Sequence, residues 1–270
     1  MGYLFSADNW EWLWTENNAS FLLEAFLVNI EIAAIAIVLA LVCGLALALA
    51  SIAQSRPLRL AAKGWVDVFR NLPLIFLILY LALSLPDSVK DFWGDNAPGF
   101  LPEALRGKLV IAGILGLVLY NSAVLAEIMR AGILSLDRGQ RDAAAALGLS
   151  YRQQMRHVVL PQGLRRMVPA TVSQLITLNK DTTLVSIIAI QEVVRSGRIL
   201  SQTAGNPFVG GGDVTAPILQ VMLFIGLLFV ITNYALSRLS RRLEVRESQR
   251  TASARPVTVT GVEDQAIATP

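Results

Sequence analysis

The stretch IAAIAIVLALVCGLALALASIA at residues 32–53 contains no charged side chain. A run of about 20 apolar residues is long enough to cross the hydrocarbon core of a bilayer as a helix. A second uncharged run, VTAPILQVMLFIGLLFVITNYALS, covers residues 214–237. In the whole chain 54% of the residues are hydrophobic and 16% are charged, whereas soluble domains are about one quarter charged. The sequence therefore predicts an all-α integral membrane protein rather than a very apolar soluble one.

Five membrane-spanning helices are predicted, at about residues 29–53, 65–85, 109–133, 167–190 and 216–238. The second must tolerate Asp67, Arg70 and Pro73 within its length. The fourth has the weakest signal, because the polar run NKDTT at 179–183 interrupts it.

Basic residues indicate the orientation, because cytoplasmic loops of membrane proteins are enriched in lysine and arginine. The loops on the side of the N-terminus hold no, three and two basic residues. The segments on the other side, 55–65, 130–166 and 238–270, hold three, seven and six. We therefore predict an external N-terminus and a cytoplasmic C-terminus. Removing the fourth span would place the basic tail outside, which supports counting that span.

The domain organisation follows from these spans. Residues 1–22 are predicted to be an external segment, and their acidic residues and missing basic n-region do not fit a signal peptide. Residues 23–245 form the transmembrane domain. Its largest cytoplasmic loop covers residues 134–166. Residues 246–270 are rich in Thr, Ala, Val and Ser without periodicity, and we expect a disordered cytoplasmic tail.

The large loop contains RDAAAALGLSYRQQMRHVVLPQ at residues 141–162. The alanine run favours a helix, and Gly148 is placed to end it at the position after the C-cap. Ser150 begins an S-x-x-Q capping box that starts a second helix. Pro161 kinks or restarts the chain before the fourth span. This stretch is therefore predicted to form a helix, a glycine turn and a second helix, followed by a proline.

Two partners fit this loop. Its alanines leave one helix almost free of side chains, which allows close approach to a groove in another protein. Its arginines, Arg138, Arg141, Arg152 and Arg156, equally fit an amphipathic helix on anionic lipid. The residues alone leave both alternatives open.

The spacing of this loop resembles the EAA motif of ABC importer permeases, written EAA-x3-G-x9-I-x-LP. The matching residues here are Asp142, Ala143, Ala144, Gly148, Val158, Leu160 and Pro161. Two substitutions are conservative: Asp142 stands for Glu, and Val158 for Ile. The segments FRNLP at 69–73, LYNSAVLAEIMRAGILSLDRGQ at 119–140 and LNKDTTLVSIIAIQEVVR at 178–195 are similar to the polar amino acid uptake branch of this family. That branch includes histidine, glutamine, arginine and glutamate/aspartate permeases.

The resemblance implies a type I ABC importer permease fold in a bacterial plasma (inner) membrane, with alternating access as the mechanism. It implies that Asp142, Ala143, Ala144, Gly148, Leu160 and Pro161 couple the chain to a cytoplasmic ATPase dimer, so that a protein groove is favoured over lipid. It also implies a second permease subunit, identical or paralogous, and an external binding protein that contacts loops 84–108 and 194–216. ATP and Mg²⁺ would bind to the ATPase, because this chain has no G-x-x-x-x-G-K-[ST] phosphate loop.

Charged and polar residues within spans are costly, so each one is a functional candidate. Glu127 and Arg130, like Asp67 and Arg70, are three residues apart and can pair on one helix face. For both pairs the simpler interpretation is an ion pair at a helix end near lipid headgroups.

Lys180 and Asp181 lie further from a span end. An α-amino acid needs a donor and an acceptor, and this position offers both, beside Asn179, Thr182 and Thr183. The simpler alternative is structural pairing with another span or with the second permease. Asn121, Ser122 and Asn71 could face the same path through the membrane.

Other function classes fit less well. A secondary carrier is the main alternative, but no inverted repeat of the secondary-transporter kind is visible. One histidine, one cysteine and no H-E-x-x-H leave an intramembrane metalloprotease without ligands. We predict no catalytic residue, no metal and no nucleic-acid partner. Within the family, the segments at 69–73 and 119–140 look most like permeases for glutamate, aspartate or glutamine.

Overall fold

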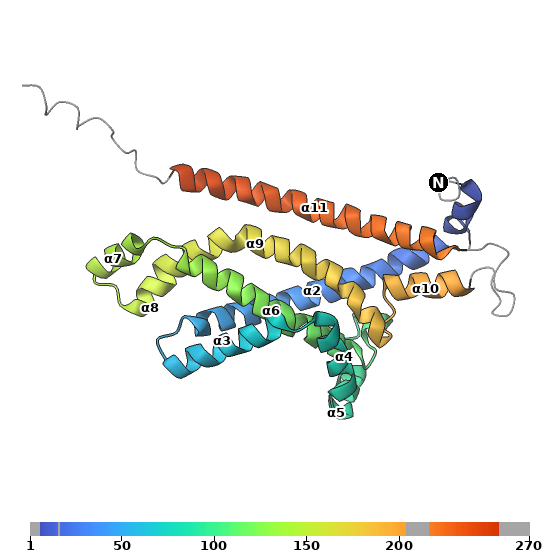
Figure 1. The fold of residues 1–270 in the computed structure, drawn as a ribbon, viewed down its shortest axis with the longest axis horizontal. Helices are drawn as coiled ribbons and strands as arrows, with labels where there is room; N and C mark the ends of the chain where they lie inside the picture. Colours follow the sequence, from blue (N-terminus) through green and yellow to red (C-terminus); the bar gives the residue numbers. More distant parts are fainter. Residues whose placement is uncertain (1–5, 16, 204–215, 254–270) are drawn as a thin grey trace, which may run out of the picture.

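The computed structural model describes residues 6–15, 17–203 and 216–253. Every regular element in these residues is a helix, as predicted. The helices form an elongated bundle (Figure 1). At one end lie α7 (Arg138–Ala146) and α8 (Tyr151–Gln154), and at the other lie the 3₁₀ helix η1 (Ala7–Leu13) and α10 (Val193–Thr203).

The centre of the bundle is the pair α2 (Asn18–Ser51) and α6 (Val110–Leu134). Small buried residues recur at every fourth position of α2: Ala36, Ala40, Gly44 and Ala48. A Cβ added to Gly44 would lie 3.0 Å from the Cβ of Leu125 in α6. Because small residues let membrane helices approach closely, this row of small residues allows α2 and α6 to pack tightly against each other.

A second small residue brings α6 close to α4 (Leu74–Ser84). A Cβ on Gly116 would lie 2.7 Å from Cγ1 of Ile78, a residue that is itself fully buried. Gly44 and Gly116 therefore both lie where α6 packs closely against a neighbouring helix.

The predicted second span over residues 65–85 is not one helix. Its residues belong to α3 (Arg56–Asn71) and α4, which meet at an angle of 102°. The cause is Pro73, because a proline disfavours helical backbone in the residue before it. Leu72 is accordingly extended, with φ −77° and ψ 138°. α4 has 11 residues, so it is about 16 Å long and too short to cross a bilayer of about 30 Å alone.

The predicted fourth span, 167–190, also differs from a single helix. A continuous helical path runs through α8, the π-helical turn η3 (Met155–Val159) and α9 (Leu160–Asp181). It then tightens into the 3₁₀ helix η4 (Thr182–Ile188) and ends at Ala189, whose φ is +64°. The polar run 179–183 therefore sits where the helix changes type.

Among the described residues, three helices are long and apolar enough to cross a membrane: α2, α6 and the segment Ile218–Arg238 of α11 (Ile218–Ser253). The bent pair α3 and α4 would make a fourth. α9 does not join them, since Arg165, Arg166, Lys180 and Asp181 lower its hydropathy. Three to four candidate spans are thus present, against the five predicted.

Two predicted boundaries also move. α2 begins at Asn18, so residues 18–22 are helical and continuous with the first span rather than part of a separate external segment. α11 continues through residues 246–253, which we expected to be disordered. The rest of that predicted tail, 254–270, lies outside the described residues.

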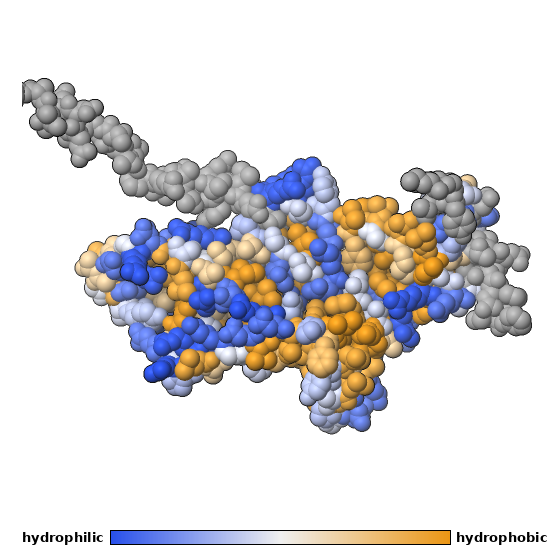
Figure 2. Space-filling model, viewed as in Figure 1, coloured by the Kyte–Doolittle hydropathy of each residue, from blue (hydrophilic) through white to orange (hydrophobic). Residues whose placement is uncertain are grey.

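The surface separates along the bundle (Figure 2). Hydrophobic residues cover α4 and the first half of α11, whereas hydrophilic residues gather near α3, α7 and α8. Exposed apolar side chains on these two helices include Phe76, Tyr80, Leu83, Val230 and Ile231. An apolar band beside a polar end is the surface that a membrane protein presents to lipid or neighbouring membrane helices on one side and to water on the other.

Candidate functional site

The loop predicted to couple to a partner is a compact helix–turn–helix. Asp137 caps α7, since its carboxylate accepts a hydrogen bond of 2.9 Å from the N–H of Gly139. Ala144 is the buried residue of α7, and α7 packs against η3. Asp142 and Ala143 are exposed on the opposite side. Most of α7 is therefore exposed, and only the side that carries Ala144 packs against the rest of the protein.

Gly148 makes the turn as predicted. Its φ is +76°, a left-handed conformation that glycine adopts without steric cost. The N–H of Gly148 donates to the carbonyl of Ala145 at 2.9 Å, and the N–H of Leu149 donates to Ala144 at 3.2 Å. These two bonds are the pair that defines a Schellman motif, so the end of α7 has its last carbonyls satisfied.

The second helix starts at the predicted capping box. The side-chain oxygen of Gln153 accepts hydrogen bonds of 2.9 Å from both the N–H and the hydroxyl of Ser150. One turn later comes the π-helical turn, where the N–H of Leu160 donates to Met155, five residues back. Pro161 follows directly. Because proline lacks an N–H and its ring crowds the carbonyl four residues earlier, the widened turn accommodates it without breaking the helix.

The tip of this loop is apolar and exposed. Leu147 has 82% of its surface exposed, and the neighbouring Gly148 and Tyr151 are exposed as well. Of the four arginines that suggested a lipid surface, Arg138, Arg152 and Arg156 are exposed, but Arg141 is half-buried. Arg141 instead lines a small cavity of about 90 Å³ together with Ile133 and Met155. The loop thus presents an apolar tip flanked by charge rather than one continuous basic face.

Two of the predicted path residues, Asn121 and Ser122, are buried in α6. Asn121 donates to the carbonyl of Leu117 and accepts a hydrogen bond of 2.8 Å from the side chain of Gln174 in α9. Ser122 donates to the carbonyl of Leu119. Asn121 therefore joins α6 to α9 inside the bundle, whereas Ser122 bonds only within α6.

The run 179–183 does not act as one polar cluster. Asn179 is buried and donates to the side chain of Asn233 in α11 at 3.1 Å, whereas Lys180 is exposed. Asp181 is half-buried, and no ion pair joins it to Lys180 in the described part of the chain. The structure thus separates Asn179 from Lys180, as adjacent positions on a helix must be.

The two threonines of this run also differ. Thr182 is fully buried and donates to the carbonyl of Asn179, whereas Thr183 donates to the carbonyl of Lys180 near the surface. Asn71, on α3, is exposed and donates to the carbonyl of Asp67. It caps the end of α3 and is not brought to the buried residues of α6 and α9.

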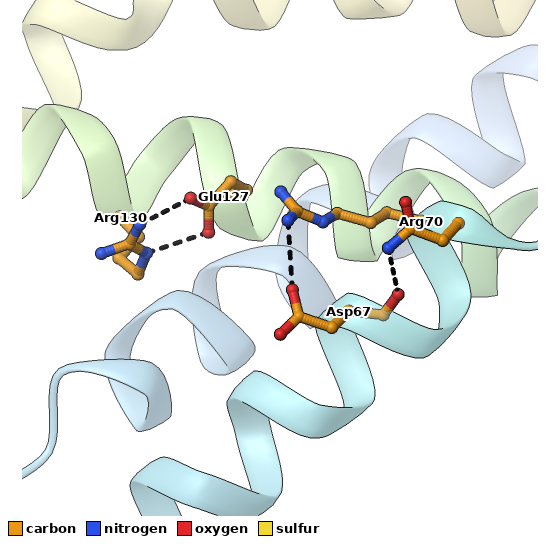
Figure 3. Close-up of polar contacts among 5 residues, drawn as sticks. Asp67, Arg70, Glu127 and Arg130 are labelled. Atoms are coloured by element: carbon orange, nitrogen blue, oxygen red, sulfur yellow. Dashed lines mark hydrogen bonds and ion pairs between the residues drawn. The ribbon is translucent and has the colours of Figure 1, made fainter.

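Both ion pairs that the spacing allows are formed, on the neighbouring helices α3 and α6 (Figure 3). Arg130 holds Glu127 through two hydrogen bonds, of 2.9 Å and 2.5 Å, and both side chains are about one third exposed or less. Arg70 holds Asp67 at 3.1 Å, but their side chains are 39% and 63% exposed. The first pair has the stronger geometry, because bidentate guanidinium contacts combine direction and charge.

A buried network that the sequence analysis missed lies beside Thr182. Asn29 of α2 donates to the carboxylate of Glu192 at 2.9 Å and to the hydroxyl of Thr182 at 3.1 Å. The side-chain oxygen of Asn29 accepts from the N–H of Val193. All three side chains, of Asn29, Thr182 and Glu192, are 0% exposed. The available signal was the polar Asn29 within an apolar run, but nothing local identifies its partners.

Glu192 also caps α10. Its two carboxylate oxygens accept from the backbone N–H groups of Val194 and Arg195, at 3.0 Å and 2.8 Å. An acidic side chain at a helix N-terminus satisfies free donors and opposes the positive end of the helix dipole. The network therefore fixes α2, the end of α9 and the start of α10 relative to one another.

The segment 84–108 is also ordered by local contacts. It contains α5 (Asp87–Asn96) and the 3₁₀ turn η2 (Glu103–Leu105). Trp93 donates its ring N–H to the carbonyl of Leu105 at 3.0 Å. Asp91 pairs with Lys108 at 2.7 Å, and this hydrogen bond raises the pKa of the Lys108 ammonium. In the other predicted docking loop, α10 covers residues up to Thr203, and 204–215 lie outside the described residues.

Apolar spans, a rigid exposed loop and buried polar contacts between spans define a multi-span membrane protein that works with a partner. The chain belongs to the family of inner membrane components of binding-protein-dependent transport systems, whose family model matches residues 32–245.

Similar sequences come from several bacteria. The chain is 34% identical over 235 residues to the probable glutamine ABC transporter permease protein GlnP of Bacillus subtilis strain 168, covering 87% of this chain and 97% of that protein. It is 32% identical to the glutamate transport system permease protein GluD of Corynebacterium glutamicum, covering 91% and 81%. It is 29% identical to the glutamate/aspartate import permease protein GltK of Escherichia coli O157:H7, covering 84% and 93%.

Solved structures share the fold. A crystal structure described as an amino acid ABC transporter with histidines superposes with a TM-score of 0.69 at 24% identity, covering 87% of this chain and 98% of that chain. An inward-facing MetNI methionine ABC transporter superposes with a TM-score of 0.55 at 20% identity, covering 87% and 97%.

Proposed function

We infer that this chain is the permease subunit of a binding-protein-dependent ABC importer for polar amino acids, and not an ATPase itself. The observation that carries this is the exposed helix–turn–helix in a chain whose residues 32–245 match the permease family. Its Asp142-Ala143-Ala144, Gly148, Leu160 and Pro161 keep the spacing of the coupling motif. The printed sequence contains no phosphate-binding loop, so ATP hydrolysis belongs to a partner.

The coupling mechanism follows from how the loop is built. A cytoplasmic ATPase dimer closes on ATP, and its groove holds the exposed apolar tip around Leu147. Because the Schellman hydrogen bonds and the Gln153 cap fix the loop internally, it moves as one rigid unit. η3 and Pro161 connect the loop to α9 without a break in the helix. Displacement of the tip therefore reaches residues 174–182, which bond to α6, α11 and α2.

The proposed topology has five spans and an external N-terminus. The bent pair α3 and α4 provides the second span, and α9 with η4 provides the fourth. The exposed apolar residues of α4 face a second permease subunit, which completes the translocation path. A binding protein delivers substrate to the opposite end from the coupling loop, where 84–108 and α10 lie.

The path itself is proposed to run near the junction of α6, α9 and η4. Asn121, Asn179 and Thr182 are buried there and already paired, so they shape the path. Lys180 and Asp181 are the groups left to meet a substrate carboxylate or ammonium, whereas the Thr183 hydroxyl already donates to the carbonyl of Lys180. Asn71 and Ser122 play a supporting role at most, because both bond to nearby carbonyls.

Glutamine, glutamate or aspartate is the proposed substrate class, since relatives that match most of their length here carry those names. The test is uptake of labelled glutamine, glutamate and arginine by proteoliposomes that contain this chain, its ATPase and its binding protein. We expect ATP-dependent uptake of an acidic or amide amino acid. Uptake by the isolated chain without any ATPase would contradict the proposal.

A substitution at Asp181 tests whether the proposed substrate path passes this residue. Asp181→Ala should lower uptake more than it lowers assembly with the ATPase, whereas Glu11→Ala, an exposed acid on η1, should change neither. Normal uptake by correctly inserted Asp181→Ala protein would remove Asp181 from the path.

A further inference from the structure

A pocket of about 410 Å³ lies between the first turns of α2, the η2 segment and the start of α10. Small-molecule sites in proteins are commonly apolar clefts of about 300–1,000 Å³ with a few convergent polar groups. This pocket belongs to neither the coupling loop nor the path residues. Its apolar lining includes Phe21, Leu27, Val28 and Pro102.

The polar groups of the pocket share one property. They are the carboxylates of Glu24 and Glu31, the amide of Gln191 and the hydroxyl of Ser196. All four can accept a hydrogen bond, and no lysine or arginine is among the lining residues. The pocket is therefore negative and rich in acceptors.

Two of these groups lack a partner. Ser196 is 0% exposed, and its Oγ makes no hydrogen bond in the described part of the chain. One carboxylate oxygen of Glu31, Oε2, is likewise buried and unpaired among the described residues. Buried polar atoms of this kind are costly unless something bonds to them. The Glu31 oxygen points to a missing donor in the pocket, and the Ser196 hydroxyl can accept from the same donor.

The required ligand is a cation that carries several donors. The lining does not supply the six to eight oxygen ligands of a calcium site, and no group of three His, Cys, Asp or Glu side chains that could hold a metal ion occurs in the described residues. A primary ammonium offers three N–H donors and one positive charge, which matches two carboxylates and one hydroxyl. The apolar walls then hold its carbon chain.

We propose that this pocket binds a primary alkylammonium group, with Glu31 and Ser196 as its main partners and Glu24 beside them. The ammonium comes either from a free amine, such as an amino acid, or from an ethanolamine lipid headgroup. Ligand binding acts on the nearby buried network, because the N–H of Ser196 donates to the carbonyl of Glu192 at 2.8 Å.

The test uses the complete transporter with its ATPase, held in nanodiscs made from phosphatidylglycerol alone. Binding of n-butylammonium is measured by calorimetry, and n-butanol serves as the uncharged probe of similar shape. We expect saturable binding of the amine and none of the alcohol. Glu31→Gln and Ser196→Ala should each weaken binding, Glu31→Gln by about tenfold or more because it removes a charge-assisted bond. Glu103→Gln, an exposed acid on η2 outside the pocket, is the matched control and should bind as the wild type does.

A second arm identifies the source of the ammonium. Adding phosphatidylethanolamine to the nanodiscs should displace butylammonium if the headgroup is the occupant, and should leave binding unchanged if a free amine is. Size-exclusion profiles and basal ATPase activity check that each variant is folded. Absence of saturable amine binding, or equal binding by folded Glu31→Gln and Glu103→Gln, would overturn the proposal. Neither result depends on which amino acid the importer carries.

Discussion

Two regions of this molecule are held in contrasting ways: the helix–turn–helix loop at 137–161, proposed to couple to the ATPase, and the polar junction at 179–196. In the loop, the turn and caps depend on hydrogen bonds between residues two to five apart in sequence. In the junction, Asn29 bonds to Thr182 and Glu192 across 153 and 163 residues. The shape of the loop is therefore fixed by its own neighbours, whereas the junction holds together residues from three helices.

The exposure of the two regions differs as well. Leu147 at the loop tip is 82% exposed, while Asn29, Thr182 and Glu192 are all fully buried. An exposed rigid element suits contact with another protein. A buried network that crosses helices suits transmission of its motion. Substitutions in the junction should therefore lower the free energy of unfolding, and substitutions in the loop should lower ATP-driven uptake.

The largest effect is expected from Glu192→Ala. This change leaves the amide of Asn29 and the N–H groups of Val194 and Arg195 without their acceptor. Since each buried unpaired group costs about 1–3 kcal/mol, the folded state should lose about 3 kcal/mol or more. Thermal unfolding in detergent, followed by tryptophan fluorescence, measures this loss.

A conservative variant and a control variant make the unfolding experiment specific to the junction. Glu192→Gln keeps the size and one acceptor, so its loss should be smaller than that of Glu192→Ala. Glu103→Gln removes an exposed carboxylate from η2, outside the junction and the pocket, and should leave unfolding unchanged. If Glu192→Ala unfolds at the wild-type temperature, the junction does not hold the helices.

A smaller effect on stability, but a large one on coupling, is expected at Gly148. A Cβ added at Gly148 meets no atom within 4 Å, so the cost of Gly148→Val comes mainly from the backbone at φ +76°, about 1–2 kcal/mol. Gly148→Val should insert and fold but lose ATP-driven uptake. Gly148→Asn, which tolerates a left-handed backbone, should retain more of it. Equal uptake by both variants would show that the turn geometry does not matter.

The smallest effect is expected at the ion pair on α3. Asp67→Asn breaks an exposed pair and should cost about 0–0.5 kcal/mol, because water already screens it. Glu127→Gln breaks the bidentate pair on α6 and should cost more, about 1 kcal/mol. Denaturant or thermal unfolding of the two single variants compares them directly, and the reverse order would contradict this ranking.

The same contrast explains what the sequence could predict. Gly148, Ser150 and Pro161 act on their own neighbours, so the helix–turn–helix was predictable from local chemistry. Pro73 was visible within the second predicted span, but the 102° angle it permits depends on how α4 packs against Gly116 of α6. Length and hydropathy alone therefore suggested one straight helix.

The junction was beyond sequence reasoning for a physical reason. Glutamate is not among the preferred N-cap residues, and the partner of Glu192, Asn29, lies in a different span. Nor does the composition of 246–253 show periodicity, although α11 continues through it. Long-range pairing and helix continuation both depend on tertiary contacts that a single sequence does not display.

The central claim is that the exposed tip of the loop binds the ATPase, and one paired measurement tests it most directly. Leu147 follows α7 and Phe100 follows α5, and the two are 82% and 85% exposed, so Leu147→Asp and Phe100→Asp are alike in burial and chemistry. Each variant is co-expressed with its cognate ATPase, and the ATPase that co-purifies with it is quantified. We predict that Leu147→Asp loses the ATPase while Phe100→Asp keeps it. Retention by Leu147→Asp at the wild-type level would contradict the claim.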